Sequence, residues 1–129
     1  AVKALNPRVI YASVSAFGQS GPYAGWPAND PIVQAVSGVM DMTGEADGRP
    51  VRVGAPLPDF GAAAMLALGI STALLHRERH GEGQRIDTSL LAATLFSTIP
   101  RDGEAVRSGH APQRLGSGHP TMAPYRNYE

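Results

Sequence analysis

The stretch Val53-Gly54-Ala55-Pro56-Leu57-Pro58-Asp59-Phe60-Gly61-Ala62 organises this chain of 129 residues. An apolar, proline-containing approach ends at a single carboxylate, Asp59, and a long run of apolar and small residues follows. Aspartate is among the best helix N-caps, because its side chain accepts hydrogen bonds from the unpaired N–H groups of the first turn. The pattern therefore predicts that Asp59 is the first residue of a buried helix.

This helix is expected to run from Phe60 to about His80, with apolar side chains on all its faces. Its basic end suits the negative pole of the helix dipole, and Gly81 suits the left-handed residue that closes a helix. The apolar part, 60–75, is shorter than the roughly 20 residues of a membrane span, so we interpret it as a core helix. His76 lies one turn before His80, but no third metal ligand is near. We therefore interpret both as side chains that complement the negative end of the helix dipole.

A strand buried on both faces is expected over 9–15, which is nearly continuous in apolar character, as in a parallel sheet. The loop 16–23 follows its carboxyl end, where open α/β sheets bind ligands. Gln19 and Tyr23 lie in this loop. From the residues alone, a ligand-binding loop and an ordinary connection are equally good interpretations.

Two further helices and one short strand complete the expected α/β fold. A helix over 32–40 would be capped by Asn29 or Asp30, with Pro31 at its first position. The polar turn 43–50 is expected to be a solvated loop. A strand over 85–87 and a helix over about 89–98 follow, the latter capped by Asp87 or Thr88.

The composition changes to Gly, Pro, Arg, His and Ser from Pro100 to Pro120, which is typical of a linker. We therefore divide the chain into 1–99, the end of a large domain that holds Asp59, and 100–129, a passage into a second, small domain. The chain has no Met at position 1, and several expected apolar faces lack partners. Both features suggest an internal piece of a longer polypeptide.

Composition excludes several functions. Lys+Arg and Asp+Glu balance at 11 each, so no basic surface is expected for nucleic acid or an anionic membrane. The absence of Cys excludes disulfides, thiolate catalysis and Cys-ligated zinc, and it fits a cytoplasmic setting. No signal peptide, nucleotide-binding glycine motif or hydrolase motif is visible. These observations alone describe an α/β segment with one conspicuous carboxylate and name no reaction.

A series of short motifs, in order, covers nearly the whole chain. They are Asn6-Pro7-Arg8-Val9-Ile10-Tyr11, Phe17-Gly18-Gln19-Ser20-Gly21-Pro22-Tyr23, 30–38, Thr43-Gly44-Glu45, Asp59, His76-Arg77-Glu78-Arg79, Gly81-Glu82-Gly83-Gln84, Arg114-Leu115-Gly116, His119-Pro120 and Pro124-Tyr125. Together they resemble the class III CoA-transferases, the CaiB/BaiF type, a family that includes the α-methylacyl-CoA racemases. The resemblance implies a Rossmann-like large domain, a polypeptide about three times as long, and an interlocked homodimer.

The resemblance also implies a chemistry, in which Asp59 matches the catalytic aspartate. Its carboxylate would attack an acyl-CoA thioester to give a mixed anhydride and then an aspartyl-CoA thioester, before a free carboxylic acid takes up the CoA. Coenzyme A would be part of the substrate, with no tightly bound cofactor and no metal. The helix N-terminus would stabilise the negative charge of Asp59 but also weaken it as a nucleophile.

Two alternatives stay open beside CoA transfer. The racemase branch pairs this aspartate with a His that falls at Asn29, and Asn cannot exchange a proton at neutral pH. This departure favours transferase, although Asp59-Phe60-Gly61 resembles the racemase form of the site loop. The other alternative is an inert structural fragment. Asn29, Gln19 and Tyr23 are the candidate substrate-binding residues, and we expect the segment alone to be inactive because most CoA contacts lie outside it.

Overall fold

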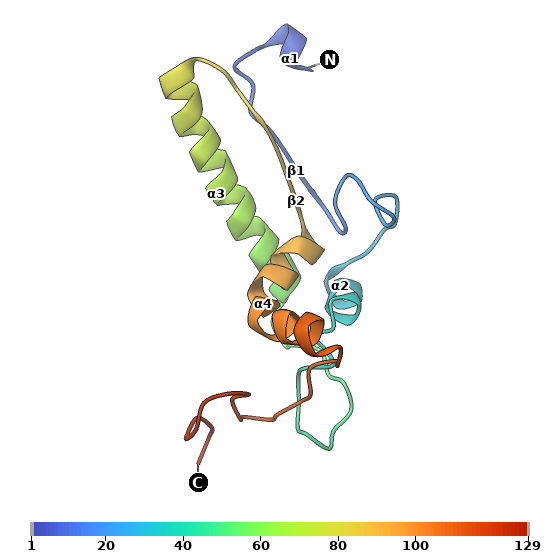
Figure 1. The fold of residues 1–129 in the computed structure, drawn as a ribbon. Helices are drawn as coiled ribbons and strands as arrows, with labels where there is room; N and C mark the ends of the chain where they lie inside the picture. The colour runs from blue at the N-terminus through green and yellow to red at the C-terminus, as the bar shows by residue number, and fades with distance from the viewer. Residues whose placement is uncertain (1, 129) are drawn as a thin grey trace.

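The computed structural model describes residues 2–128 and is an α/β structure, as expected. The chain is extended, with its two ends at opposite ends of the molecule (Figure 1). In chain order, the elements are α1 (Val2–Leu5), β1 (Tyr11–Ser15), α2 (Asp30–Val36), α3 (Leu57–His80), β2 (Arg85–Ser89) and α4 (Leu90–Ser108).

The two strands form a parallel pair, with Tyr11 opposite Arg85 and Ser15 opposite Ser89. A parallel pair needs a long crossover, and here α2 and α3 supply it. The parallel sheet was expected, but the prediction that 9–15 is buried on both faces is wrong. Tyr11 and Val14, which the alternation of side chains places on opposite faces of the strand, are both exposed, so among residues 2–128 neither face is fully covered.

The core lies where α2, α3 and α4 meet, at the carboxyl end of the two strands. The residues at its centre are small, so α3 and α4 approach each other closely: a Cβ on Gly61 would lie 3.4 Å from the Cβ of Ala93. Phe17, in the loop after β1, packs against this cluster and so ties the loop to the helices. The buried members of the cluster are Val33, Ala62, Leu90 and Ala93.

Helix α3 begins at Leu57, three residues before the predicted start at Phe60, so the assignment of Asp59 as its N-cap is wrong. The cap is Pro56, which makes no side-chain capping bond, and Asp59 is the third helical residue. Proline is tolerated in the first turn of a helix, where its missing N–H would have no partner. The end of the helix is as expected: Gly81 is left-handed, with φ of 78°, and its N–H donates to the carbonyl of Arg77.

The prediction that α3 is mostly buried is also wrong, since Phe60 and Leu68 are each 69% exposed. The helix contacts α2, α4 and both strands on one side only, as Figure 1 shows for the sheet. Within this 24-residue helix, a window of 18 residues has a mean hydropathy of 1.4, which by length and composition alone would suit a membrane span. The expectation of too short an apolar segment therefore fails. Core helices of soluble α/β proteins meet the same criterion.

The other helix ends differ from the predictions in detail. Asn29 caps α2, as one of the two alternatives proposed, and Pro31 is its second residue rather than its first. Ser89, instead of Asp87 or Thr88, caps α4 by accepting from the N–H of Ala92.

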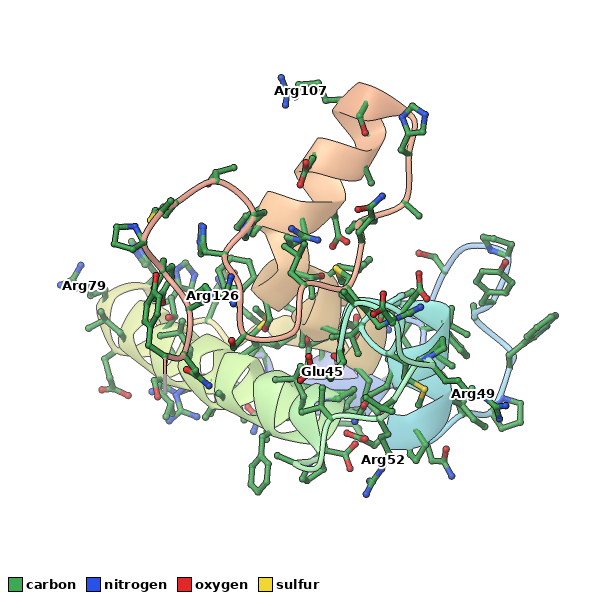
Figure 2. The ribbon with its side chains drawn as sticks, turned by 90° about the horizontal axis from the view of Figure 1, so that it is seen from below. Glu45, Arg49, Arg52, Arg79, Arg107 and Arg126 are labelled. Carbon is green, nitrogen blue, oxygen red and sulfur yellow. The ribbon has the colours of Figure 1, made fainter. Side chains whose placement is uncertain are left out.

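The tract interpreted as linker from Pro100 onward is helical as far as Ser108, because α4 continues through this proline. The side chain of Arg101 donates to the carbonyl of Gln113, which folds the following chain back on the helix. The division into domains at residue 99 stays a prediction. Arg79 and Arg107 mark the free ends of α3 and α4, and the solvated turn at 43–50 carries Glu45 and Arg49 (Figure 2).

Gly83 provides a stability test of the fold, because the chain before β1 passes directly over it. A Cβ at this position would lie 1.8 Å from the carbonyl oxygen of Val9. We expect Gly83→Ala to lower the free energy of unfolding by about 3 kcal/mol, measured by denaturant titration. Gly103→Ala is the control: nothing lies within 4 Å there, and the change should raise stability by up to about 1 kcal/mol. Equal stability of the two variants would contradict the packing described.

Candidate functional site

The carboxylate of Asp59 is exposed at the start of α3, and the backbone donors around it are already used or missing. Pro56 and Pro58 have no N–H group. The N–H of Leu57 donates to the carbonyl of Ala55 at 2.9 Å. These neighbours therefore offer the Asp59 side chain no backbone donor.

The remaining two donors of the first turn are also engaged. The N–H of Phe60 donates to the carbonyl of Pro56 at 3.1 Å. The N–H of Asp59 itself donates to Oδ2 of Asp30 at 3.4 Å. Within the described part of the chain, no hydrogen bond or salt bridge reaches the Asp59 carboxylate. The two carboxylate oxygens are therefore unpaired among the described residues, although they lie at a helix N-terminus.

Asp30 and Gln34 connect α2 to the approach of Asp59. Gln34 is fully buried, and its Nε2 donates to Oδ1 of Asp30 at 2.7 Å. Its Oε1 accepts from the N–H of Val53 at 2.9 Å, while Nε2 also lies 3.5 Å and 3.4 Å from the carbonyl oxygens of Val53 and Ala55. One side chain thus fixes both the segment before α3 and the carboxylate that receives the Asp59 N–H.

Asn29 precedes Asp30 directly, so it lies beside the start of α3. Its Oδ1 accepts from the N–H of Ile32 at 3.4 Å, the capping contact of α2. The structure therefore brings Asn29 and Asp59 to the same region through Asp30. The side chain of Asn29 is exposed, and its role in substrate binding stays a prediction.

Gln19 and Tyr23 lie in the loop after β1, but neither has a contact with Asp59 among the interactions of residues 2–128. The Nε2 of Gln19 donates to Oγ of Ser13 at 3.1 Å, which turns this side chain back toward the strand. The ring of Tyr23 lies between Phe17 and Trp26, with centroid separations of 5.6 Å and 5.0 Å. Their assignment to substrate binding stays a prediction.

The two histidines of α3 are remote from this site. The rings of His76 and His80 lie 4.5 Å apart between centroids at the far end of the helix, about 25 to 30 Å along the axis from Asp59. Over residues 2–128 there is no group of three or more His, Asp or Glu side chains that could hold a metal ion.

Sequence reasoning missed the part that Asp30 and Gln34 play. The available signal was their spacing: residues four apart lie on the same face of a helix, so the two polar side chains are neighbours. Val33, beside them in sequence, is buried and indicates that this face points inward. A buried polar pair needs partners, and the backbone at Val53 and Ala55 provides them.

Comparison with known proteins agrees with this architecture. A model of the family described as CoA-transferase family III matches residues 1–129, and the chain belongs to this family. It is 41% identical over 124 residues to the succinate–glutarate CoA-transferase of Agrobacterium fabrum, covering 96% of this chain and 31% of that protein. It is 48% identical over 122 residues to the acetyl-CoA:oxalate CoA-transferase of Acetobacter aceti, covering 94% and 31%. The chain thus spans about a third of the length of these relatives.

Solved structures show the same backbone. The crystal structure of a CaiB/BaiF family protein from Brucella suis matches with a TM-score of 0.87 and 37% identity. The match covers 97% of this chain and 33% of the other. The resemblance found in the motifs is therefore confirmed, and the chain corresponds to one segment of a larger fold.

Gln34 provides a direct test of the network. Gln34→Leu removes the donor to Asp30 and the acceptor for the Val53 N–H, so the buried Asp30 and the half-buried Val53 N–H both lose this partner. We expect the free energy of unfolding to fall by about 3 kcal/mol, measured by denaturant titration. Gln84→Leu, at an exposed glutamine, should change it by less than about 0.5 kcal/mol. A small effect at both positions would contradict the anchoring role of Gln34.

Proposed function

We propose that this chain holds the nucleophile of a CoA-transferase that moves CoA between an acyl-CoA thioester and a free carboxylic acid. The whole activity belongs to a longer polypeptide, and the 129-residue segment alone is inactive. The observation that carries the proposal is the unpaired, exposed carboxylate of Asp59 at the start of α3, in a chain that belongs to a CoA-transferase family.

The reaction proceeds through Asp59 in balanced steps. A carboxylate oxygen of Asp59 attacks the thioester carbonyl, the C–S bond breaks, and a mixed anhydride and CoA thiolate form. The thiolate then attacks the aspartyl carbonyl, which releases the first acid as its carboxylate and leaves an aspartyl-CoA thioester. The acceptor carboxylate attacks this thioester and regenerates an anhydride and thiolate. Attack of the thiolate on the acceptor's carbonyl gives the new acyl-CoA and restores Asp59.

The surroundings of Asp59 support this role. A hydrogen bond to a carboxylate stabilises its charge and withdraws electron density from the attacking oxygen. No backbone N–H group of the first turn donates to the Asp59 carboxylate. Pro58 has none, and those of Leu57, Asp59 and Phe60 donate to Ala55, Asp30 and Pro56. The dipole of α3 still favours negative charge at this end without binding the nucleophile directly.

The names of the relatives support carboxylic acids as acceptors, and short dicarboxylates such as succinate and oxalate are the first acceptors to assay. The proposal includes a cytoplasmic, interlocked homodimer without a tightly bound cofactor. The exposed apolar side chains Phe60, Leu68 and Phe96 support it, because the rest of the polypeptide or a second subunit would cover them.

The second candidate, a racemase, lacks its proton-exchanging partner for Asp59. Position 29 carries an amide that caps α2 rather than an imidazole. CoA transfer needs no such partner, so the presence of Asn29 supports the transferase.

Replacement of Asp59 tests the proposed function in the full-length protein. We expect Asp59→Asn to lower kcat for CoA transfer from an acyl-CoA to succinate or oxalate by a factor of about 10⁴ or more, because the amide cannot form the anhydride. Asp47→Asn, on the exposed turn, is the control and should keep full activity. If the Asp59→Asn variant still transferred CoA, Asp59 could not be the nucleophile. Solvent deuterium at the α-carbon of a 2-methylacyl-CoA, without transfer, would identify a racemase.

A further inference from the structure

We propose that Asp30 is a positioning residue for the reaction: its buried carboxylate, fixed by Gln34, holds the backbone of Asp59 and so presents the Asp59 carboxylate to the acyl group. The inference rests on the proposed function of Asp59. It assigns a task to a buried acidic group that the chemical steps themselves do not use.

Asp30 is buried, so its carboxylate needs hydrogen-bond partners inside the protein. It is only 5% exposed, and a buried carboxylate is costly unless its oxygens are paired. Both oxygens are engaged, Oδ1 by the amide of Gln34 and Oδ2 by the backbone N–H of Asp59. The bond from Gln34 is short at 2.7 Å and fixes the carboxylate, while the bond from the Asp59 N–H is longer at 3.4 Å and connects that carboxylate to the first turn of α3.

The second oxygen of Asp30 has a specific consequence for Asp59. The contact is to the backbone of the nucleophile, so it sets the position of the Cα from which the reactive side chain projects. It also occupies an N–H at the helix N-terminus without using the Asp59 side chain. Asp30 therefore fixes the nucleophile while leaving its oxygens unbound.

Gln34 makes this arrangement rigid from the other side. Its amide contacts Asp30, both backbone polar groups of Val53 and the carbonyl of Ala55. The chain on either side of Pro56 is thereby anchored to α2. Displacement of the approach segment and loss of the Asp30 contact would both move Asp59, and a shift of about 1 Å in a reacting group can cost 10²-fold in rate.

The test compares Asp30→Asn with Asp47→Asn in the full-length protein. Asparagine keeps the size of Asp30 but removes its charge and one of its two acceptor oxygens. We expect kcat for CoA transfer to fall about 10- to 100-fold while KM for the acyl-CoA stays within about twofold, because the bound substrate meets a misplaced nucleophile. The double variant with Gln34→Leu should lose less than the product of the single losses, since the two residues act as one unit. Asp47→Asn should match the unmodified protein.

Unchanged kcat in folded Asp30→Asn, or a loss confined to KM, would overturn the inference even where Asp59→Asn abolishes transfer. Transfer that survives Asp59→Asn would instead remove the proposed function itself. Hydrogen exchange of the Asp59 amide in the unmodified protein tests the contact without any substitution, in case Asp30→Asn does not fold. Protection of this amide supports the contact, and exchange at the rate of an open chain overturns it.

Discussion

The hydrogen bonds of Gln34 are the constraint on which the rest of this structure depends. Its side chain is wholly inside the molecule, yet it reaches Asp30 on its own helix and Val53 and Ala55 on the segment that leads to α3. An amide can donate and accept at once, and this one does both. It joins a short helix of seven residues to the start of a helix of 24 residues, across a solvated turn.

The two prolines before Asp59 explain why its carboxylate is unpaired. In a capping box, an acidic residue at the third helical position accepts from the backbone N–H of the N-cap residue. Asp59 occupies this third position, but the N-cap residue is Pro56, which has no N–H. Pro58 removes a further donor from the same turn. The sequence Pro-Leu-Pro-Asp thus places a carboxylate at a helix start and withholds the partner that it would normally find there.

Local features such as helix ends and strand type were predictable from the sequence, while the burial of side chains was not. The left-handed Gly81, the Asn29 cap and the parallel strand type follow from short-range rules, and the structure has all three. The start of α3 was misplaced because the prolines were interpreted as a boundary, although a first turn tolerates them. Pro100 misled in the same way, because α4 runs through it to Ser108. The exposed faces of α3 could not be foreseen, since burial depends on which other segments are present.

The position of Asp59 in the candidate site was predicted through family resemblance, but its surroundings came only from the fold. Asp30 lies 29 residues earlier in the chain, and only the packing of α2 against α3 brings its carboxylate to the Asp59 N–H. Asn29 lies in the same region because it directly precedes Asp30 in the chain. Gln19 and Tyr23 are held by contacts of their own loop, with Ser13 and with two aromatic rings.

The most direct measurement is chemical trapping of the proposed covalent intermediate in the full-length protein. The enzyme is incubated with an acyl-CoA, hydroxylamine is added, and the peptide containing Asp59 is examined by mass spectrometry. An activated aspartyl carbonyl reacts with hydroxylamine, so we predict an aspartyl hydroxamate at Asp59 that depends on the acyl-CoA. An unmodified Asp59 in an enzyme that is actively transferring CoA would contradict it.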